Sequence, residues 1–125
     1  MSTTISVTAC DNELIMVAYN TNDNSVSYEL CRFLSGYHYS VNVPITVNVG
    51  PFLGTLQVNG LSGSINQPLN ILLPQGSYNL LLIGINWGAG EASFKVTVNN
   101  QPFNYSNHGA QAGVVWTPAP ISITV

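Results

Sequence analysis

The side chains best suited to chemistry in this 125-residue chain are amides and aromatic rings that lie close together along the sequence. Three groups combine them: Tyr37, His38 and Tyr39; Asn86 and Trp87 with Glu91; and Phe103, Asn104 and Tyr105 with Asn107, His108 and Trp116. A pyranose ring has an apolar C–H face that stacks on an aromatic side chain, and its hydroxyls are donors and acceptors, as is an Asn amide. The combination indicates binding of neutral sugars.

Six residues are the expected contacts to a glycan: Asn86, Trp87, Glu91, Asn104, Tyr105 and His108. The alternative for each aromatic ring is a place at the rim of the core with its polar tip satisfied, and Tyr78 is assigned to the core. Because single sugar sites are weak, a lectin gains strength by multivalency. A homo-oligomer is therefore part of the prediction.

The sequence offers few residues suited to metal binding or catalysis. A zinc site needs three or four ligands, and His38, His108, Cys10 and Cys31 have no paired spacing. No Gly-x-Ser-x-Gly elbow is present, and Asp11 and Glu13, expected to project to one side of a strand end, are read as solvated charges. We predict no enzyme activity, no metal and no cofactor. Calcium is the alternative, since residues 20–24 offer several side-chain oxygens, although such runs usually form Asx-rich turns.

Charge excludes two classes of partner. The chain has two Lys and Arg residues and five Asp and Glu residues, and residues 33–90 carry no formal charge. Two cations cannot neutralise a run of phosphates or hold the protein to an anionic membrane, so nucleic acid and charged lipid are excluded. The apolar runs Leu14–Tyr19 and Leu80–Ile83 are too short for a transmembrane span, which predicts no membrane insertion.

The N-terminus has no basic residue followed by a solid apolar stretch, so cytoplasmic synthesis without a signal peptide is expected, with non-classical export as the alternative. Cys10 and Cys31 are then expected to be buried thiols in a reducing compartment. If the protein leaves the cell, the two could instead form a disulfide.

Hydrophobicity alternates with a period of two along most of the chain, which predicts β-strands that bury one face. The clearest case is Val41–Val49, and Pro44 within it indicates an edge strand or a bulge. Leu14–Tyr19 and Leu80–Ile85 are apolar on both parities and are expected to be central strands covered on both sides. Further strands are expected at residues 5–9, 26–34, 52–58, 92–98 and 121–125.

These strands predict an all-β, antiparallel Greek-key β-sandwich of immunoglobulin-like or jelly-roll type, with eight to ten short strands. Turn residues separate them, for example at residues 60–64 and 99–102. Residues 1–125 are predicted to form one domain. Within it, residues 99–125 are an extra hairpin or an assembly arm.

One stretch is more specific. Tyr78 lies just inside a strand after Gly76, which is the spacing of a tyrosine corner, where the phenol bonds to upstream backbone. Residues 69–98, with the Gly-rich loop 88–90, resemble the last hairpin of an immunoglobulin-like domain. Both cysteines lie in the N-terminal third, so the inter-sheet disulfide of antibody domains is absent. The resemblance implies a sandwich and carries no function.

A second function remains open, that of a non-catalytic structural or self-assembling module that binds protein. Low charge leaves few repulsive groups at sheet edges, so the Pro44 strand and Ile121–Val125 could pair with a neighbouring chain. The two functions differ in their response to sugar, since a ligand that binds the folded state raises the melting temperature.

Overall fold

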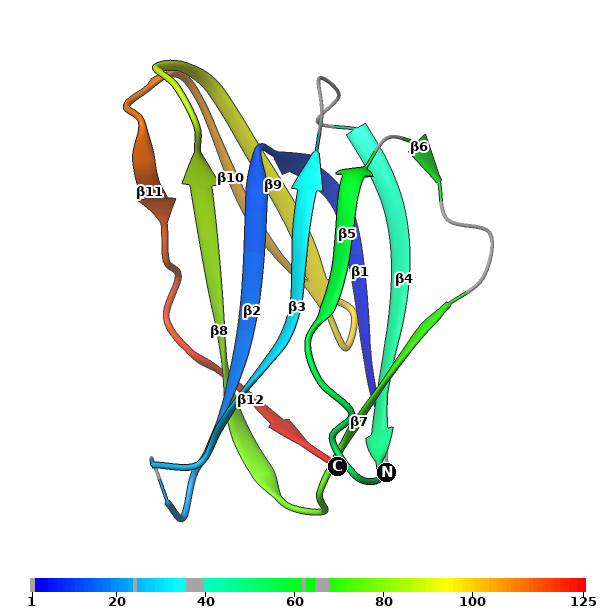
Figure 1. Ribbon diagram of the computed structural model, residues 1–125. Coiled ribbons are helices and arrows are strands. Elements are labelled where there is room, and N and C mark those ends of the chain that lie inside the picture. The colour runs from blue at the N-terminus through cyan, green and yellow to red at the C-terminus, as the bar shows by residue number, and fades with distance from the viewer. Residues whose placement is uncertain (1, 24, 36–39, 62, 65–67) are drawn as a thin grey trace.

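The computed structural model describes residues 2–23, 25–35, 40–61, 63–64 and 68–125, which form two β-sheets packed face to face (Figure 1). Sheet A has the order β10 (Gln101–Ala110), β9 (Gly90–Val98), β1 (Thr3–Asp11), β4 (Ser40–Val49) and β6 (Gly63–Ser64), and β7 (Leu69–Leu73) also pairs with β4. Sheet B has the order β11 (Gly113–Trp116), β8 (Ser77–Asn86), β2 (Glu13–Asn20), β3 (Ser27–Ser35) and β5 (Leu56–Leu61), and β12 (Ile121–Thr124) also pairs with β8. The predicted all-β sandwich is confirmed.

The sheets are mixed, so the purely antiparallel arrangement was wrong. β5 runs parallel to β3, and both β6 and β7 run parallel to β4. From β3 to β7 the chain alternates between the sheets: β3 lies in sheet B, β4 in sheet A, β5 in sheet B, and β6 and β7 in sheet A. A strand that returns to its sheet after such a crossing can run in the same direction as its neighbour, whereas a tight hairpin forces opposite directions. The described residues form twelve strands, against the eight to ten expected.

The core lies between the sheets and is built from the alternating positions. Val41, Val43, Ile45 and Val47 of β4 are all buried, as the period of two predicts. β8 is central in sheet B, as expected, but the prediction that both of its faces are covered is only partly met. Its even-numbered side chains are buried, whereas Leu81, Ile83 and Ile85 on the other face are half-buried.

The tyrosine corner is confirmed. Tyr78 is 1% exposed, and its hydroxyl donates a 2.7 Å hydrogen bond to the carbonyl of Pro74. The phenol thereby ties the turn before β8 to the core, where a polar group without a partner would be costly. The expected hairpin of residues 69–98, however, is not a hairpin. β8 belongs to sheet B and β9 to sheet A, so their loop crosses between the sheets.

Pro44 lies in an interior strand, so its expected place at an edge was wrong. β4 pairs with β1 on one side and with β6 and β7 on the other. The parallel pairing covers residues 41–42 and 45–49, and Pro44 falls between the two stretches, where its missing N–H breaks no ladder bond. A register shift between Val7 and Ala9 of β1 lies beside it, which agrees with the expected irregularity.

Residues 101–124 contribute edge strands to both sheets. β10 pairs with β9, whereas β11 and β12 pair with successive parts of β8. In the region expected to be a turn, Gly60 and Leu61 belong to β5, and Gly63 and Ser64 form β6. Cys10 and Cys31 are buried thiols, and burial together with the nearby Cys10 raises the pKa of Cys31. Within the described ranges, no helix has the length and apolar character needed to cross a bilayer.

Candidate functional site

Trp87 stands at the end of the sandwich where β8 stops and the chain crosses to β9 (Figure 1). Its side chain is 51% exposed. The backbone N–H of Trp87 donates to Oδ1 of Asn12 at 2.9 Å, and the N–H of Asn12 donates to the carbonyl of Ile85 at 3.1 Å. Asn12 lies in the β1–β2 connection, so these two bonds tie that connection to the Trp87 loop.

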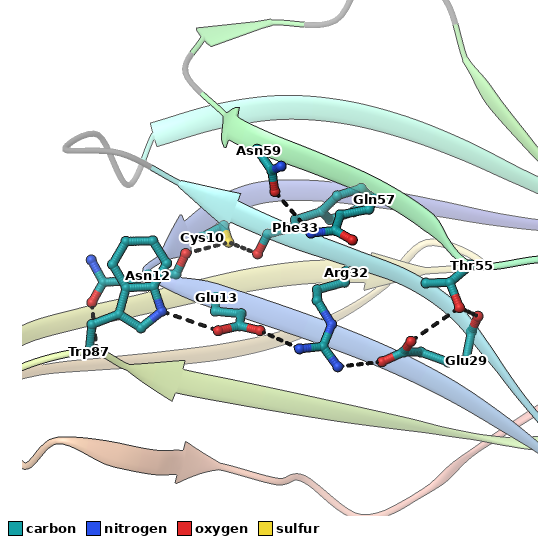
Figure 2. Close-up of polar contacts among 10 residues, drawn as sticks. All are labelled: Cys10, Asn12, Glu13, Glu29, Arg32, Phe33, Thr55, Gln57, Asn59 and Trp87. Atoms are coloured by element: carbon teal, nitrogen blue, oxygen red, sulfur yellow. Dashed lines mark hydrogen bonds and ion pairs between the residues drawn. The ribbon is translucent and has the colours of Figure 1, made fainter.

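The indole ring is held as well. Its Nε1–H donates to Oε1 of Glu13 at 3.1 Å, and Figure 2 shows that this contact begins a row of polar groups across sheet B. Nη1 of Arg32 donates to Oε2 of Glu13 at 3.0 Å, and Nη2 donates to Oε1 of Glu29 at 2.7 Å. The hydroxyl of Thr55 completes it with a 3.1 Å bond to Oε2 of Glu29. We call these five residues, Trp87, Glu13, Arg32, Glu29 and Thr55, the polar row.

The charges of the polar row compensate one another. Hydrogen bonding to Arg32 lowers the pKa of Glu29, and the same contact raises the pKa of Arg32. Glu13 is 9% exposed, so its carboxylate depends on these partners. Both arms of the Arg32 guanidinium bind carboxylates of the chain itself.

A β-bulge puts Glu29 and Arg32 on one face. Arg32 is opposite Ile15 and Glu29 is opposite Val17, with the register shift at Leu30. In a regular strand, residues three apart point to opposite faces. The extra residue reverses the alternation, so both charged groups lie on the outer face of sheet B, beside Ile15 and Val17.

A second polar group lies at the same end of the sandwich. Nδ1 of His108 is 3.8 Å from Oε2 of Glu91, and their side chains are 87% and 46% exposed. Asp11, at the end of β1, is close enough that Glu91 adds to the effect of burial in raising the pKa of Asp11. Two predicted residues that are 17 positions apart in sequence are thus brought together.

The remaining predicted contacts have different surroundings. Asn86 is 2% exposed and its amide donates to the carbonyl of Gln111 at 3.3 Å, so it fastens the Trp87 loop to the β10–β11 connection. Asn104 is exposed on β10, opposite Lys95. Tyr105 is half-buried, with its ring centroid 6.4 Å from that of Phe94, and its hydroxyl accepts from Asn107 at 3.3 Å.

An aromatic stack closes the sandwich beside these residues. Trp116 lies parallel to Phe94, with the centroids 5.8 Å apart and the planes 10° apart. Gly84 of β8 leaves room for this ring, because a Cβ there would lie 2.8 Å from Cε2 of Phe94. Trp116, unlike Trp87, therefore contributes to packing.

The other segments considered as binding sites in the sequence do not form a ligand site among the described residues. Asn20 and Asp23 form Asx turns, since their Oδ1 atoms accept from the N–H groups of Asn22 and Ser25. Among the residues that the structure describes, no group of three or more His, Cys, Asp and Glu side chains could hold a metal ion. The cluster Tyr37, His38 and Tyr39 lies outside the described residues.

Sequence reasoning missed the polar row. Asp11 and Glu13 were expected on the same side of one strand, but Asp11 ends β1 in sheet A and Glu13 begins β2 in sheet B. The irregular alternation around residues 26–34 was the available signal of the bulge.

No family model, curated protein or solved structure matches this chain.

Proposed function

We propose that this protein is a carbohydrate-binding protein that recognises neutral glycans, with the Trp87 indole as the stacking surface. The observation that carries the proposal is the state of Trp87, which is half-exposed yet held by hydrogen bonds at both its backbone and indole nitrogens. A ring fixed before binding loses little conformational freedom when a ligand arrives. Because Glu13 already satisfies the indole N–H, the ring offers its apolar surface.

The neighbouring polar groups favour a neutral, hydroxyl-rich ligand. Glu91 and His108 are exposed at the same end of the sandwich, and their oxygen and nitrogen atoms can bind sugar hydroxyls. Arg32 would be the natural partner for an acidic sugar, but its two arms are held by Glu13 and Glu29. The proposed contacts are therefore Trp87, Glu91 and His108, with Asn104 and Tyr105 as outer contacts and Asn86 fixing the loop.

The finer fold type also remains a proposal. The tyrosine corner at Tyr78 is a feature of Greek-key sandwiches and supports that arrangement here. From the sequence alone we further propose a non-catalytic protein without a cofactor.

A glycan screen tests the proposed function, followed by titration calorimetry of the best ligand against the wild type and Trp87→Ala. Loss of the stacking surface should weaken binding by about tenfold or more, since a stacked aromatic contributes about 1.4 kcal/mol or more with its buried area. Leu53→Ala is the matched control, because Leu53 is an exposed apolar residue of the β4–β5 connection. That connection lies at the opposite end of the sandwich from the β8–β9 connection (Figure 1). Equal affinity in the wild type and Trp87→Ala would contradict the proposal.

The self-assembling module is the second candidate, and thermal unfolding separates the two. A lectin at a ligand concentration of 100 Kd gains about 2.7 kcal/mol of stability, and its melting temperature rises. A module that binds only protein shows no change with any sugar.

A further inference from the structure

A pocket of about 590 Å³ opens between the edges of the two sheets, away from Trp87. Residues from the end of β4, from β7, from the β4–β5 connection and from the start of β5 line it. In Figure 1 the β4–β5 connection lies near the chain termini. Its walls are mainly apolar and come from Phe52, Leu53, Leu56, Ile71 and Leu72, with Gly54 and the polar residues Asn48, Thr55 and Asn70. Its volume lies within the range of small-ligand sites.

The β4–β5 connection, which forms part of the pocket wall, carries an exposed apolar side chain. Leu53 is 82% exposed, and Val49, four residues earlier, is 50% exposed. The turn is anchored on both sides of Leu53. On one side the Phe52 ring packs against Tyr28 with centroids 4.9 Å apart, and on the other the Thr55 hydroxyl donates to the carbonyl of Glu29. Gly54 between them has a positive φ of 112°, which favours glycine.

Polar groups at the pocket are largely satisfied within the chain. The Thr55 hydroxyl bonds to the carbonyl of Glu29 at 2.9 Å, and Asn70 Oδ1 accepts from the hydroxyl of Thr46. None of the described residues that line the pocket is charged. An occupant is therefore expected to be apolar and neutral at this surface.

We propose that a second copy of this chain docks here about a twofold axis, with Leu53 of each copy entering the pocket of the other. A twofold interface sets a surface against itself, so it needs a protrusion and a matching recess on one patch. Leu53 and the adjoining pocket supply both. Like charges facing each other across the axis would oppose such an interface, and the described lining residues carry none. The carboxylate at the pocket edge, Glu29 beside Thr55, is paired with Arg32 at 2.7 Å.

This surface leaves the Trp87 end free. The β4–β5 connection and the β8–β9 connection lie at opposite ends of the sandwich (Figure 1). A dimer joined through Leu53 therefore presents two Trp87 loops on its outside, and two linked sites bind a multivalent surface more strongly than one. The interface itself does not depend on whether the protein binds glycans.

Sedimentation velocity on the full chain tests the proposal across micromolar concentrations. The wild type should have twice the 13.4 kDa chain mass, and Leu53→Asp, which places two carboxylates at the axis, should be a monomer. Val114→Asp is the matched control, since Val114 is an exposed apolar residue on β11, at 62% exposure, and this variant should remain a dimer. A monomeric wild type, a dimeric Leu53→Asp, or loss of the dimer in Val114→Asp would overturn the proposal.

A small apolar ligand is the competing occupant, and the dye N-phenyl-1-naphthylamine reports it. In the proposed dimer the pocket is filled, so the dye should fluoresce weakly with the wild type. A monomeric wild type that binds the dye and loses it in Leu56→Asn would assign the pocket to a small molecule and refute the dimer. Titration with a monovalent glycan tests the dimer and the proposed glycan binding independently. The monomeric variant Leu53→Asp should bind this glycan with the same Kd as the wild type, because the dimer interface does not include the Trp87 loop.

Discussion

Glu13 joins the fold to the proposed binding surface, so its removal should affect both. Its carboxylate accepts from the Trp87 indole at 3.1 Å and from Arg32 at 3.0 Å, and the residue is 9% exposed. A hydrogen bond to a charged group contributes about 1.5–3 kcal/mol when buried, and a partly exposed ion pair contributes up to about 1 kcal/mol. Glu13→Ala should therefore lower the free energy of unfolding by about 2–3 kcal/mol.

That loss is measurable by heat and by urea. With an unfolding entropy of about 2.1 cal/mol/K per residue, 125 residues convert 2–3 kcal/mol to a decrease in Tm of about 8–11 °C. Glu29→Ala is the matched control, because it removes the other partner of Arg32 but leaves the Trp87 contact. Glu29 is about one-third exposed, so its loss should cost about 1 kcal/mol or less.

The glycan titration separates anchoring of the ring from general destabilisation. Without Glu13 the indole must be ordered by the ligand, which costs about 0.5–1.5 kcal/mol, or about a two- to tenfold weaker affinity. Glu29→Ala should bind as the wild type does, and Glu13→Gln, which retains an acceptor for the indole, should recover most of the affinity. The reasoning is refuted if Glu13→Ala binds as tightly as the wild type, or if Glu29→Ala weakens binding equally.

Two further substitutions test the packing. Gly84→Ala should destabilise the fold by about 2 kcal/mol in urea titration, because its Cβ would lie 2.8 Å from the Phe94 ring, whereas Gly88→Ala, with nothing within 4 Å, should be near neutral. Equal effects of the two would contradict the close approach of β8 to Phe94. Tyr78→Phe should cost about 1 kcal/mol by removing the bond to the Pro74 carbonyl, and an unchanged urea midpoint would show that this bond contributes nothing.

Local patterns were sufficient for most strands and for the tyrosine corner. Alternation located β1, β4 and β9, because a sandwich strand buries every second side chain. Gly76 and Tyr78 located the corner before β8, since that motif is closed by residues near in sequence. β10 and β11 carry many exposed side chains at the sheet edges, so they show little alternation, and their region was expected only as an extra hairpin or an assembly arm.

Features that depend on the pairing of strands distant in sequence could not be predicted from the sequence pattern. Pro44 resembles an edge residue, and only the separate placement of β6 and β7 shows how an interior strand accommodates it. Glu29 and Arg32 share a face because of the bulge at Leu30, which depends on the register with β2. For the candidate site, composition indicated Trp87, Glu91 and His108, while the part played by Glu13 required the three-dimensional structure.

The most direct test of glycan binding at Trp87 is a titration followed by the indole N–H signals in a ¹⁵N–¹H correlation spectrum. The chain has two tryptophans, so it gives two such signals, and Trp87→Phe assigns them. The proposal predicts that a neutral glycan shifts the Trp87 signal saturably and leaves that of Trp116, stacked on Phe94, in place. A ligand that shifts only the Trp116 signal, or a full set of neutral glycans that shifts neither, would contradict it.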